Sequence, residues 1–139
     1  MEGRAMVRYI AISVICGFLF AVMDGVINAN PIGRKLNEAF KPIAKTSINM
    51  IAGIIIDLVY GFALAGIFVI LFNSLPGETG LVKGISLAIL AWFLRVVMST
   101  ASNWIMYKVP GKTLFYNLFT GLVEMMILGL VCGAWLRPW

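Results

Sequence analysis

The sequence predicts an all-α integral membrane protein with four transmembrane helices, and three observations support this prediction. First, 61% of the 139 residues are hydrophobic and only 12% are charged, whereas an average soluble domain carries about 25% charged residues. Second, the mean hydropathy is +0.97, and a chain this short has too little interior to remove so much apolar surface from water. Third, the charged residues leave four apolar stretches, each long enough for the roughly 20 residues that cross a bilayer.

We expect one membrane domain over residues 1–139, with helices at about 7–28, 47–73, 84–107 and 113–136. Each of the four apolar stretches contains one ionisable residue, in chain order Asp24, Asp57, Arg95 and Glu124. The short connection Val109-Pro110-Gly111-Lys112 has the composition of a tight turn. The third and fourth helices are therefore predicted to form an antiparallel hairpin.

A basic segment follows the first predicted helix. Asn30 and Pro31 are typical of an N-cap and a first helical position, and four apolar residues then recur at helical spacing: Ile32, Leu36, Phe40 and Ile43. This pattern predicts an amphipathic interfacial helix over about 31–45, and an ordinary basic loop is the alternative. We expect its basic residues to face anionic lipid: Arg34, Lys35, Lys41 and Lys45.

The lysine and arginine distribution predicts the orientation in the membrane. One face holds six basic residues, Arg34, Lys35, Lys41, Lys45, Lys108 and Lys112, and the other face holds four, Arg4, Arg8, Lys83 and Arg137. Basic loops tend to face the cytoplasm. Both termini, which belong to the less basic face, are therefore predicted to lie outside.

The spacing of small residues predicts how the helices pack. The second and fourth helices resemble each other when Gly61 is aligned with Gly129, which suggests two parallel helix-pair repeats; chance agreement in a glycine-rich chain is the alternative. Small residues also recur every four positions, which permits close helix contact within the chain or in a dimer. These are Ser13, Gly17, Ala21 and Gly25 on the first helix, and Gly129 and Gly133 on the last.

The depths of the ionisable residues predict a charge cluster. Arg95 and Glu124 lie at nearly equal distances from the turn at residue 110, so they share a depth. Asp57 is assigned to the same depth, and Asp24 to a shallower one. Because an isolated charge at the centre of a transmembrane helix costs about 2.5–3.5 kcal/mol, we expect Arg95, Glu124 and Asp57 to converge.

Counting charges turns this cluster into a functional hypothesis. One guanidinium neutralises one carboxylate, and burial away from water favours the neutral form of an unpaired carboxyl group. We therefore expect Asp57 to change its protonation or ion binding during function; the alternative is that the charges merely fix the helix register. The candidate residues for ion, proton or substrate binding are Asp57, Glu124, Arg95, Asp24, Asn117, Tyr60 and Ser99.

Several function classes lack the residues they need. There is no histidine, which argues against a His-ligated haem, a zinc protease and an imidazole-activated nucleophile. No nucleotide-binding motif or metal-spaced cluster occurs, and Asp24 and Asp57 lack the Gly-x-Gly-Asp context of intramembrane aspartyl proteases. We therefore expect no enzymatic activity, cofactor, metal or nucleic-acid partner. The apolar surroundings of Cys16 and Cys132 indicate no secreted disulfide framework.

The sequence Gly121-Leu122-Val123-Glu124, followed by Gly129 and Gly133, resembles the closing helix of small uncharacterised four-helix inner-membrane proteins of bacteria. The resemblance lies in the last third of the chain and implies the topology and a bacterial inner membrane, with no assigned activity. Small multidrug transporters also have four helices, but their membrane-embedded glutamate is on the first helix, where this chain has Asp24.

Together these patterns predict non-catalytic proton- or small-ion-linked transport, or a channel-like role. The alternative is an accessory or assembly subunit that binds other membrane helices, with purely structural buried charges. Either role is compatible with a homodimer or a larger membrane complex, because a single four-helix bundle leaves little space for a central pathway.

Overall fold

The structure is a computed structural model that describes residues 2–136, all of whose regular elements are helical. Four helices are long and apolar enough to cross a membrane, as the sequence predicts. In chain order the elements are α1 (Glu2–Ala29), α2 (Pro31–Asn37), the 3-10 turn η1 (Glu38–Phe40), α3 (Met50–Leu71), α4 (Gly80–Trp92), the π-helical stretch η2 (Phe93–Val97), α5 (Met98–Met106) and α6 (Gly111–Trp135). α4, η2 and α5 form one continuous helix, Gly80–Met106.

Local capping explains where α3 and α4 begin. The Asn49 side chain accepts a hydrogen bond of 3.1 Å from the Ala52 backbone N–H, so α3 starts at Met50 rather than at residue 47. The Thr79 hydroxyl accepts a hydrogen bond of 3.3 Å from the Val82 N–H, so α4 starts at Gly80 rather than at residue 84. Both caps satisfy a backbone donor that the first turn of a helix leaves unpaired.

The predicted amphipathic helix over residues 31–45 is too long. α2 ends at Asn37 and η1 at Phe40, and residues 41–49 form turns, bends and irregular chain. Pro42 explains the early end, because it has no N–H to donate to the preceding turn. α2 is held against α6, since the Thr113 hydroxyl donates a hydrogen bond of 2.6 Å to the Leu36 carbonyl. The basic residues of the segment are all exposed: Arg34, Lys35, Lys41 and Lys45.

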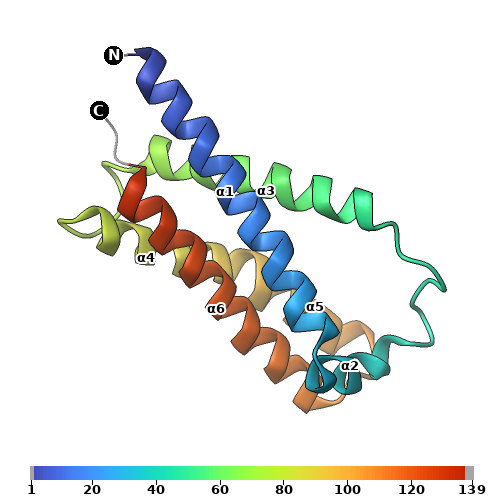
Figure 1. The fold of residues 1–139 in the computed structure, drawn as a ribbon. Helices are drawn as coiled ribbons and strands as arrows, with labels where there is room; N and C mark the ends of the chain where they lie inside the picture. Colours follow the sequence, from blue (N-terminus) through green and yellow to red (C-terminus); the bar gives the residue numbers. More distant parts are fainter. Residues whose placement is uncertain (1, 137–139) are drawn as a thin grey trace.

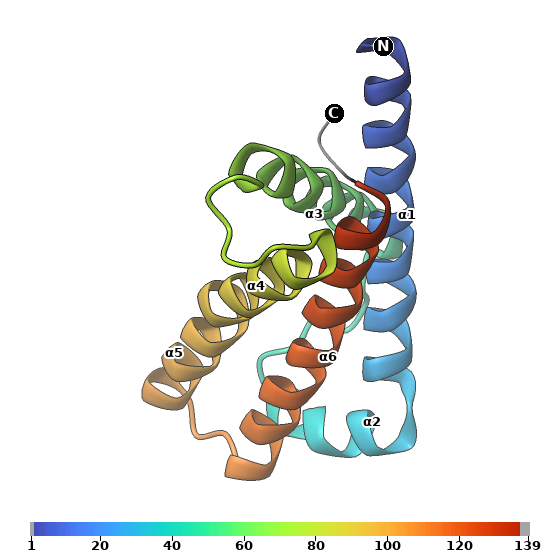
Figure 2. The same ribbon diagram turned by 90° about the vertical axis from the view of Figure 1, so that its left-hand side faces the viewer.

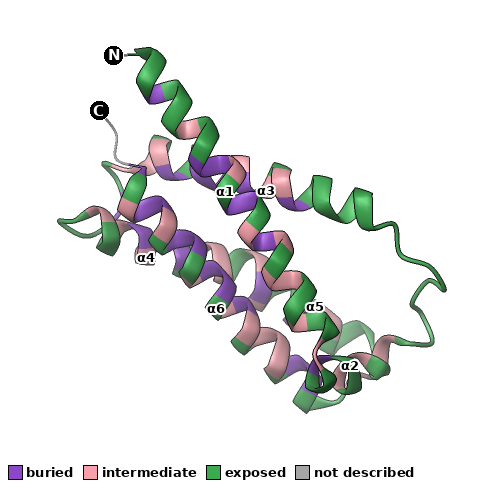
Figure 3. Ribbon diagram, in the orientation of Figure 1, coloured by how far each residue is buried: buried purple, intermediate pink, exposed green. Residues whose placement is uncertain are grey.

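The long helices pack as two pairs. α1 packs on α3 and α4 packs on α6, and the pairs join where α1 lies alongside α6 (Figures 1 and 2). The start of α1 and the end of α6 lie at one end of the bundle, which we call the terminal end, while α2 lies at the opposite, basic end. α3 crosses α1 obliquely, and the first part of α3, residues 50–56, is exposed (Figure 3).

Glycine residues make the closest helix contacts. A Cβ atom added to Gly61 on α3 would lie 2.5 Å from the Gly17 backbone nitrogen on α1. Gly84 on α4 meets Gly129 on α6 in the same way. The small residues are therefore used for packing within the chain, where the absence of side chains lets two helix backbones touch. Gly53, in contrast, faces open space.

The apolar core occupies the half of the bundle nearer the terminal end. Its fully buried side chains come from all four long helices and include Phe20, Phe68, Leu87 and Leu128. The sulfur atoms of Cys16 and Cys132 also meet here, 3.7 Å apart. The half of the bundle nearer the basic end is therefore left for polar side chains.

Two glycine substitutions on α3 test the close contact. Gly61→Ala should lower the free energy of unfolding in detergent by about 1–3 kcal/mol, because the new methyl group forces the α1 and α3 backbones apart. Gly53→Ala is the matched control, because its methyl group would enter open space while the helix propensity gained is the same. Equal stabilities of the two variants would show that the contact is not tight.

Candidate functional site

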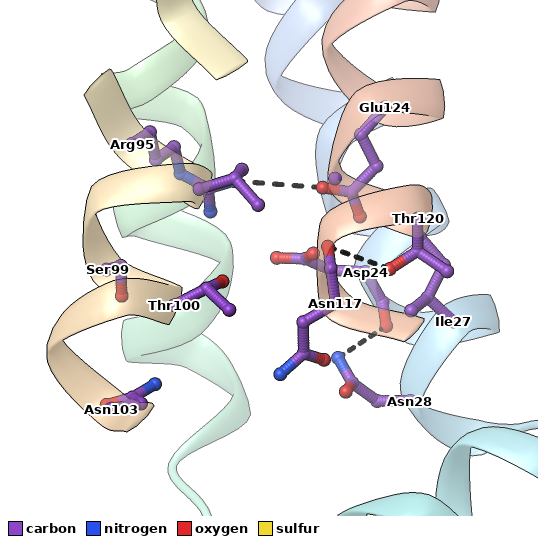
Figure 4. Close-up of a pocket in the computed structure, with 12 residues that line it drawn as sticks. Asp24, Ile27, Asn28, Arg95, Ser99, Thr100, Asn103, Asn117, Thr120 and Glu124 are labelled. Carbon is purple, nitrogen blue, oxygen red and sulfur yellow. Dashed lines mark hydrogen bonds and ion pairs between the residues drawn. The ribbon is translucent and has the colours of Figure 1, made fainter. Parts of the chain in front are cut away.

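A polar pocket of about 290 Å³ lies between α1, the η2–α5 stretch and α6 (Figure 4). Twelve residues line it, and most of them carry a charge, an amide or a hydroxyl group. They are Asp24, Ile27 and Asn28 from α1, Arg95, Val96, Ser99, Thr100 and Asn103 from η2–α5, and Asn117, Thr120, Gly121 and Glu124 from α6.

The inner end of the pocket carries its charged groups. Arg95 Nη1 lies 3.8 Å from Glu124 Oε2, which confirms the predicted pair across the hairpin. The Glu124 side chain is 5% exposed and that of Arg95 37%. Asp24 reaches the same place from α1, and its carboxyl group lies beside that of Glu124 (Figure 4). The pocket thus brings together two carboxyl groups and one guanidinium, from three separate helices.

Two stacked aromatic rings support the guanidinium. The Arg95 guanidinium carbon lies 4.5 Å from the centre of the Phe20 ring and 4.9 Å from that of Tyr60. These rings stack on each other with centroids 5.0 Å apart. The Tyr60 hydroxyl is fixed in turn, because it donates a hydrogen bond of 3.5 Å to the Met125 sulfur. A cation above an aromatic face is stabilised by the electron density of the ring, so Arg95 is held even though its ion pair is long.

The π-helical stretch η2 sets the direction of the polar residues that follow it. A π-helical turn inserts one residue into an α-helix, and such insertions often occur at functional sites. From Val96 within η2 onward, the interior face therefore continues through Thr100 and Asn103. In an unbroken α-helix Ser102 would lie on the Arg95 face, but here it is exposed and donates a hydrogen bond of 3.0 Å to the Met98 carbonyl of its own helix.

Polar side chains continue from the charged groups to the basic end of the bundle. Asn28 and Asn103 lie close to the ends of their helices, Ala29 and Met106, and Asn117 lies six residues after the start of α6 at Gly111. Arg95 and Glu124 lie deeper, about 16 and 20 Å along their helices from these ends at 1.5 Å per residue. Since the hydrocarbon layer of a bilayer is about 30 Å thick, the pocket reaches from one end of the bundle to near its middle.

The structure brings together five of the seven residues that the sequence singles out: Asp24, Arg95, Ser99, Asn117 and Glu124. Tyr60 contacts the site from outside the pocket, beneath Arg95. Asp57 does not line the pocket; it is buried where α3 crosses α1, and its backbone oxygen lies close to Gly17. Among the described residues Asp57 forms no ion pair with Arg95, although its carboxyl group lies within charge-interaction range of Arg95, Asp24 and Glu124. Asp24 rather than Asp57 lines the pocket, because α3, which carries Asp57, crosses α1 obliquely (Figure 1).

Sequence reasoning missed Phe20, Thr100 and Asn103 as parts of the site. Phe20 lies one helical turn before Asp24, and this spacing indicates that the two residues share a helix face. Thr100 and Asn103 face the pocket because of η2, and no pattern in the sequence reveals that insertion. Among residues 2–136, no group of three or more His, Cys, Asp and Glu side chains is placed to hold a metal ion.

The unequal exposure of the ion pair predicts unequal effects of neutralising its partners. Arg95→Gln should lower the free energy of unfolding by about 1–3 kcal/mol, because it leaves Glu124 and Asp24 without a cation. Glu124→Gln should cost less, since Arg95 keeps its aromatic support and Asp24.

Unfolding in detergent of both single variants and of the double variant measures these effects. The double variant should recover at least half of the stability that Arg95→Gln loses, because the buried carboxyl is then gone. Simple addition of the two single effects would show that the groups do not interact.

Comparison of the chain with family models, with curated proteins and with solved structures finds no match. The resemblance of the last helix to small bacterial four-helix proteins therefore stays a prediction.

Proposed function

We propose that this chain is a four-span membrane protein whose polar pocket binds and releases a proton or a small cation, in a non-catalytic transport or channel-like role. The observation that carries the proposal is the charge of the pocket. Two carboxyl groups, Asp24 and Glu124, share one guanidinium, Arg95, at the inner end of a polar path. The excess carboxyl group takes up a proton or a cation, because both remove the cost of an unpaired charge away from water.

The apolar core supports a gated role rather than a continuous pore. On the terminal side of the pocket the bundle is filled by fully buried apolar residues, among them Cys16, Leu128 and Cys132. In this conformation the apolar core closes the path from the pocket to the terminal end. Release on the other side requires a second conformation in which the helix pairs change their contact, as in alternating access.

The basic end of the bundle supports an orientation. Arg34, Lys35, Lys41 and Lys45 are exposed around α2, which suits contact with anionic headgroups. In this proposal α2 lies at the cytoplasmic surface of a bacterial inner membrane, both termini lie outside, and the pocket opens to the cytoplasm.

The glycine contacts support the proposal of two helix-pair repeats. The predicted internal repeat aligns Gly61 with Gly129. Each of them meets a glycine of the preceding long helix, Gly61 meeting Gly17 and Gly129 meeting Gly84. α3 and α6 also both run toward the terminal end (Figure 1). A parallel duplication of one helix pair would produce this arrangement.

A second candidate function is that of an accessory or assembly subunit. It is favoured by the exposed first part of α3, where Met50 and Ile51 are 74% and 73% exposed and no other helix of the bundle covers them. A second copy of the chain or another membrane helix could pack there. In that role the buried charges would fix only the helix register.

Flux measurements in liposomes test the leading proposal. The purified protein should carry protons or a monovalent cation down an imposed gradient, followed with a trapped pH dye and with ion-selective dyes. Glu124→Gln and Asp24→Asn should each lower the rate at least tenfold, because each removes an ionisable oxygen from the pocket. Asp57→Asn should keep more than half of the rate, because Asp57 lies outside the pocket.

Glu78→Gln is the matched control, because Glu78 is an exposed acid in the connection between α3 and α4. An unchanged rate in folded Glu124→Gln and Asp24→Asn proteins would overturn the proposal. No flux from the unaltered protein under any gradient would favour the accessory role.

A further inference from the structure

A second cavity, also of about 290 Å³, lies between α3 and α4. Its walls are almost wholly apolar, with Ala63 and Ile67 on α3 and Leu90 and Ala91 on α4. Its other notable lining residues are Tyr60 and Arg95. We call it the apolar cavity, to distinguish it from the polar pocket.

Arg95 lines both the polar pocket and the apolar cavity. It is thus the partition between a compartment with two carboxyl groups and a compartment of aliphatic side chains. The ion pair of this partition is long, because Nη1 lies 3.8 Å from Glu124 Oε2, and the Arg95 side chain is 37% exposed. A strong charge-assisted hydrogen bond would be about 2.7–2.9 Å long, so a rotation of Arg95 breaks no short bond.

We propose that the polar pocket and the apolar cavity together bind one amphipathic organic cation, whose ammonium group lies by Asp24 and Glu124 and whose apolar part lies between α3 and α4. The inference rests on the proposed function and names a substrate class for it. Rotation of the Arg95 side chain opens one compartment to the other. The same rotation uncovers the faces of Phe20 and Tyr60, which then stabilise the incoming ammonium group as they stabilise the guanidinium.

Charge complementarity selects a cation over an anion or a neutral lipid. An anionic headgroup would meet two carboxyl groups and a single guanidinium, which is a net repulsion. A neutral amphiphile would leave the excess carboxyl uncompensated. An ammonium group that enters beside Glu124 and Asp24, with the rotated Arg95 still next to them, gives two cations for the two carboxyl groups. The apolar part removes its own surface from water in the α3–α4 cavity.

Three small probes separate the two halves of the proposed site. Octyltrimethylammonium has both the charge and the chain, tetramethylammonium has only the charge, and octanoate has the chain with the opposite charge. Binding is measured by equilibrium dialysis of each labelled probe, with the protein in phosphatidylcholine nanodiscs and with empty nanodiscs as the blank. We expect octyltrimethylammonium to bind at least tenfold more tightly than either of the others.

Variants assign the binding to the two compartments. Ala91→Phe fills the apolar cavity and should weaken octyltrimethylammonium binding at least tenfold while changing tetramethylammonium binding less than twofold. Ala63→Phe fills the cavity from α3 and is the second test of the apolar cavity if Ala91→Phe does not fold. Glu124→Gln should weaken the binding of both cations. Ala101→Phe is the control, because Ala101 is exposed and lines neither cavity.

Equal binding of octanoate and octyltrimethylammonium would overturn the inference, as would folded Ala91→Phe and Ala63→Phe proteins that bind octyltrimethylammonium normally. Proton or ion flux that depends on Glu124, without octyltrimethylammonium binding, would remove this inference alone. Octyltrimethylammonium binding with the expected variant pattern, but without any flux, would support the site and remove the proposed transport role.

Discussion

The architecture depends on the cost of holding charged side chains away from water. Arg95 and Glu124 lie near the middle of long apolar helices, where each would be unfavourable alone. Their pairing, the stacked rings under Arg95 and the nearby Asp24 bring α1, α3, η2 and α6 together at one place. The pairing does not balance, however, because one guanidinium serves two carboxyl groups. The proposed function depends on that imbalance.

Two structural features, the glycine contacts and the π-helical stretch η2, allow one short bundle to have an apolar half and a polar half. Glycine contacts, Gly17 with Gly61 and Gly84 with Gly129, bring the helices of each pair together in the terminal half. In the other half the η2 stretch shifts the helix face by one residue, so that polar side chains follow the buried apolar ones on the interior. The result is a closed apolar core beside a polar pocket, with Arg95 at the junction.

Much of the fold could be predicted from the sequence, because helix number and helix contact depend on local patterns. The lengths of the four apolar stretches predict the four long helices, and the hairpin geometry brings Arg95 to Glu124. The place of Asp57 could not be predicted, since it depends on the oblique crossing of α3. The orientation of Thr100 depends on an inserted π-helical residue, which has no sequence signature. Pro42 in the sequence is compatible with the early end of α2, but the helical spacing of the apolar residues predicts a longer helix.

The proposed function requires that water reach the polar pocket from the basic end of the bundle. Two adjacent positions on α6 test it, because Thr120 lines the pocket whereas Phe119 is 60% exposed on the outer surface of the bundle. Each is changed to cysteine in a chain lacking Cys16 and Cys132, and a charged, membrane-impermeant thiol reagent is added from one side of sealed vesicles. We expect Thr120→Cys to react from the α2 side alone and Phe119→Cys not to react. Equal reactivity of the two cysteines, or no reaction at Thr120→Cys from either side, would contradict this access to the pocket.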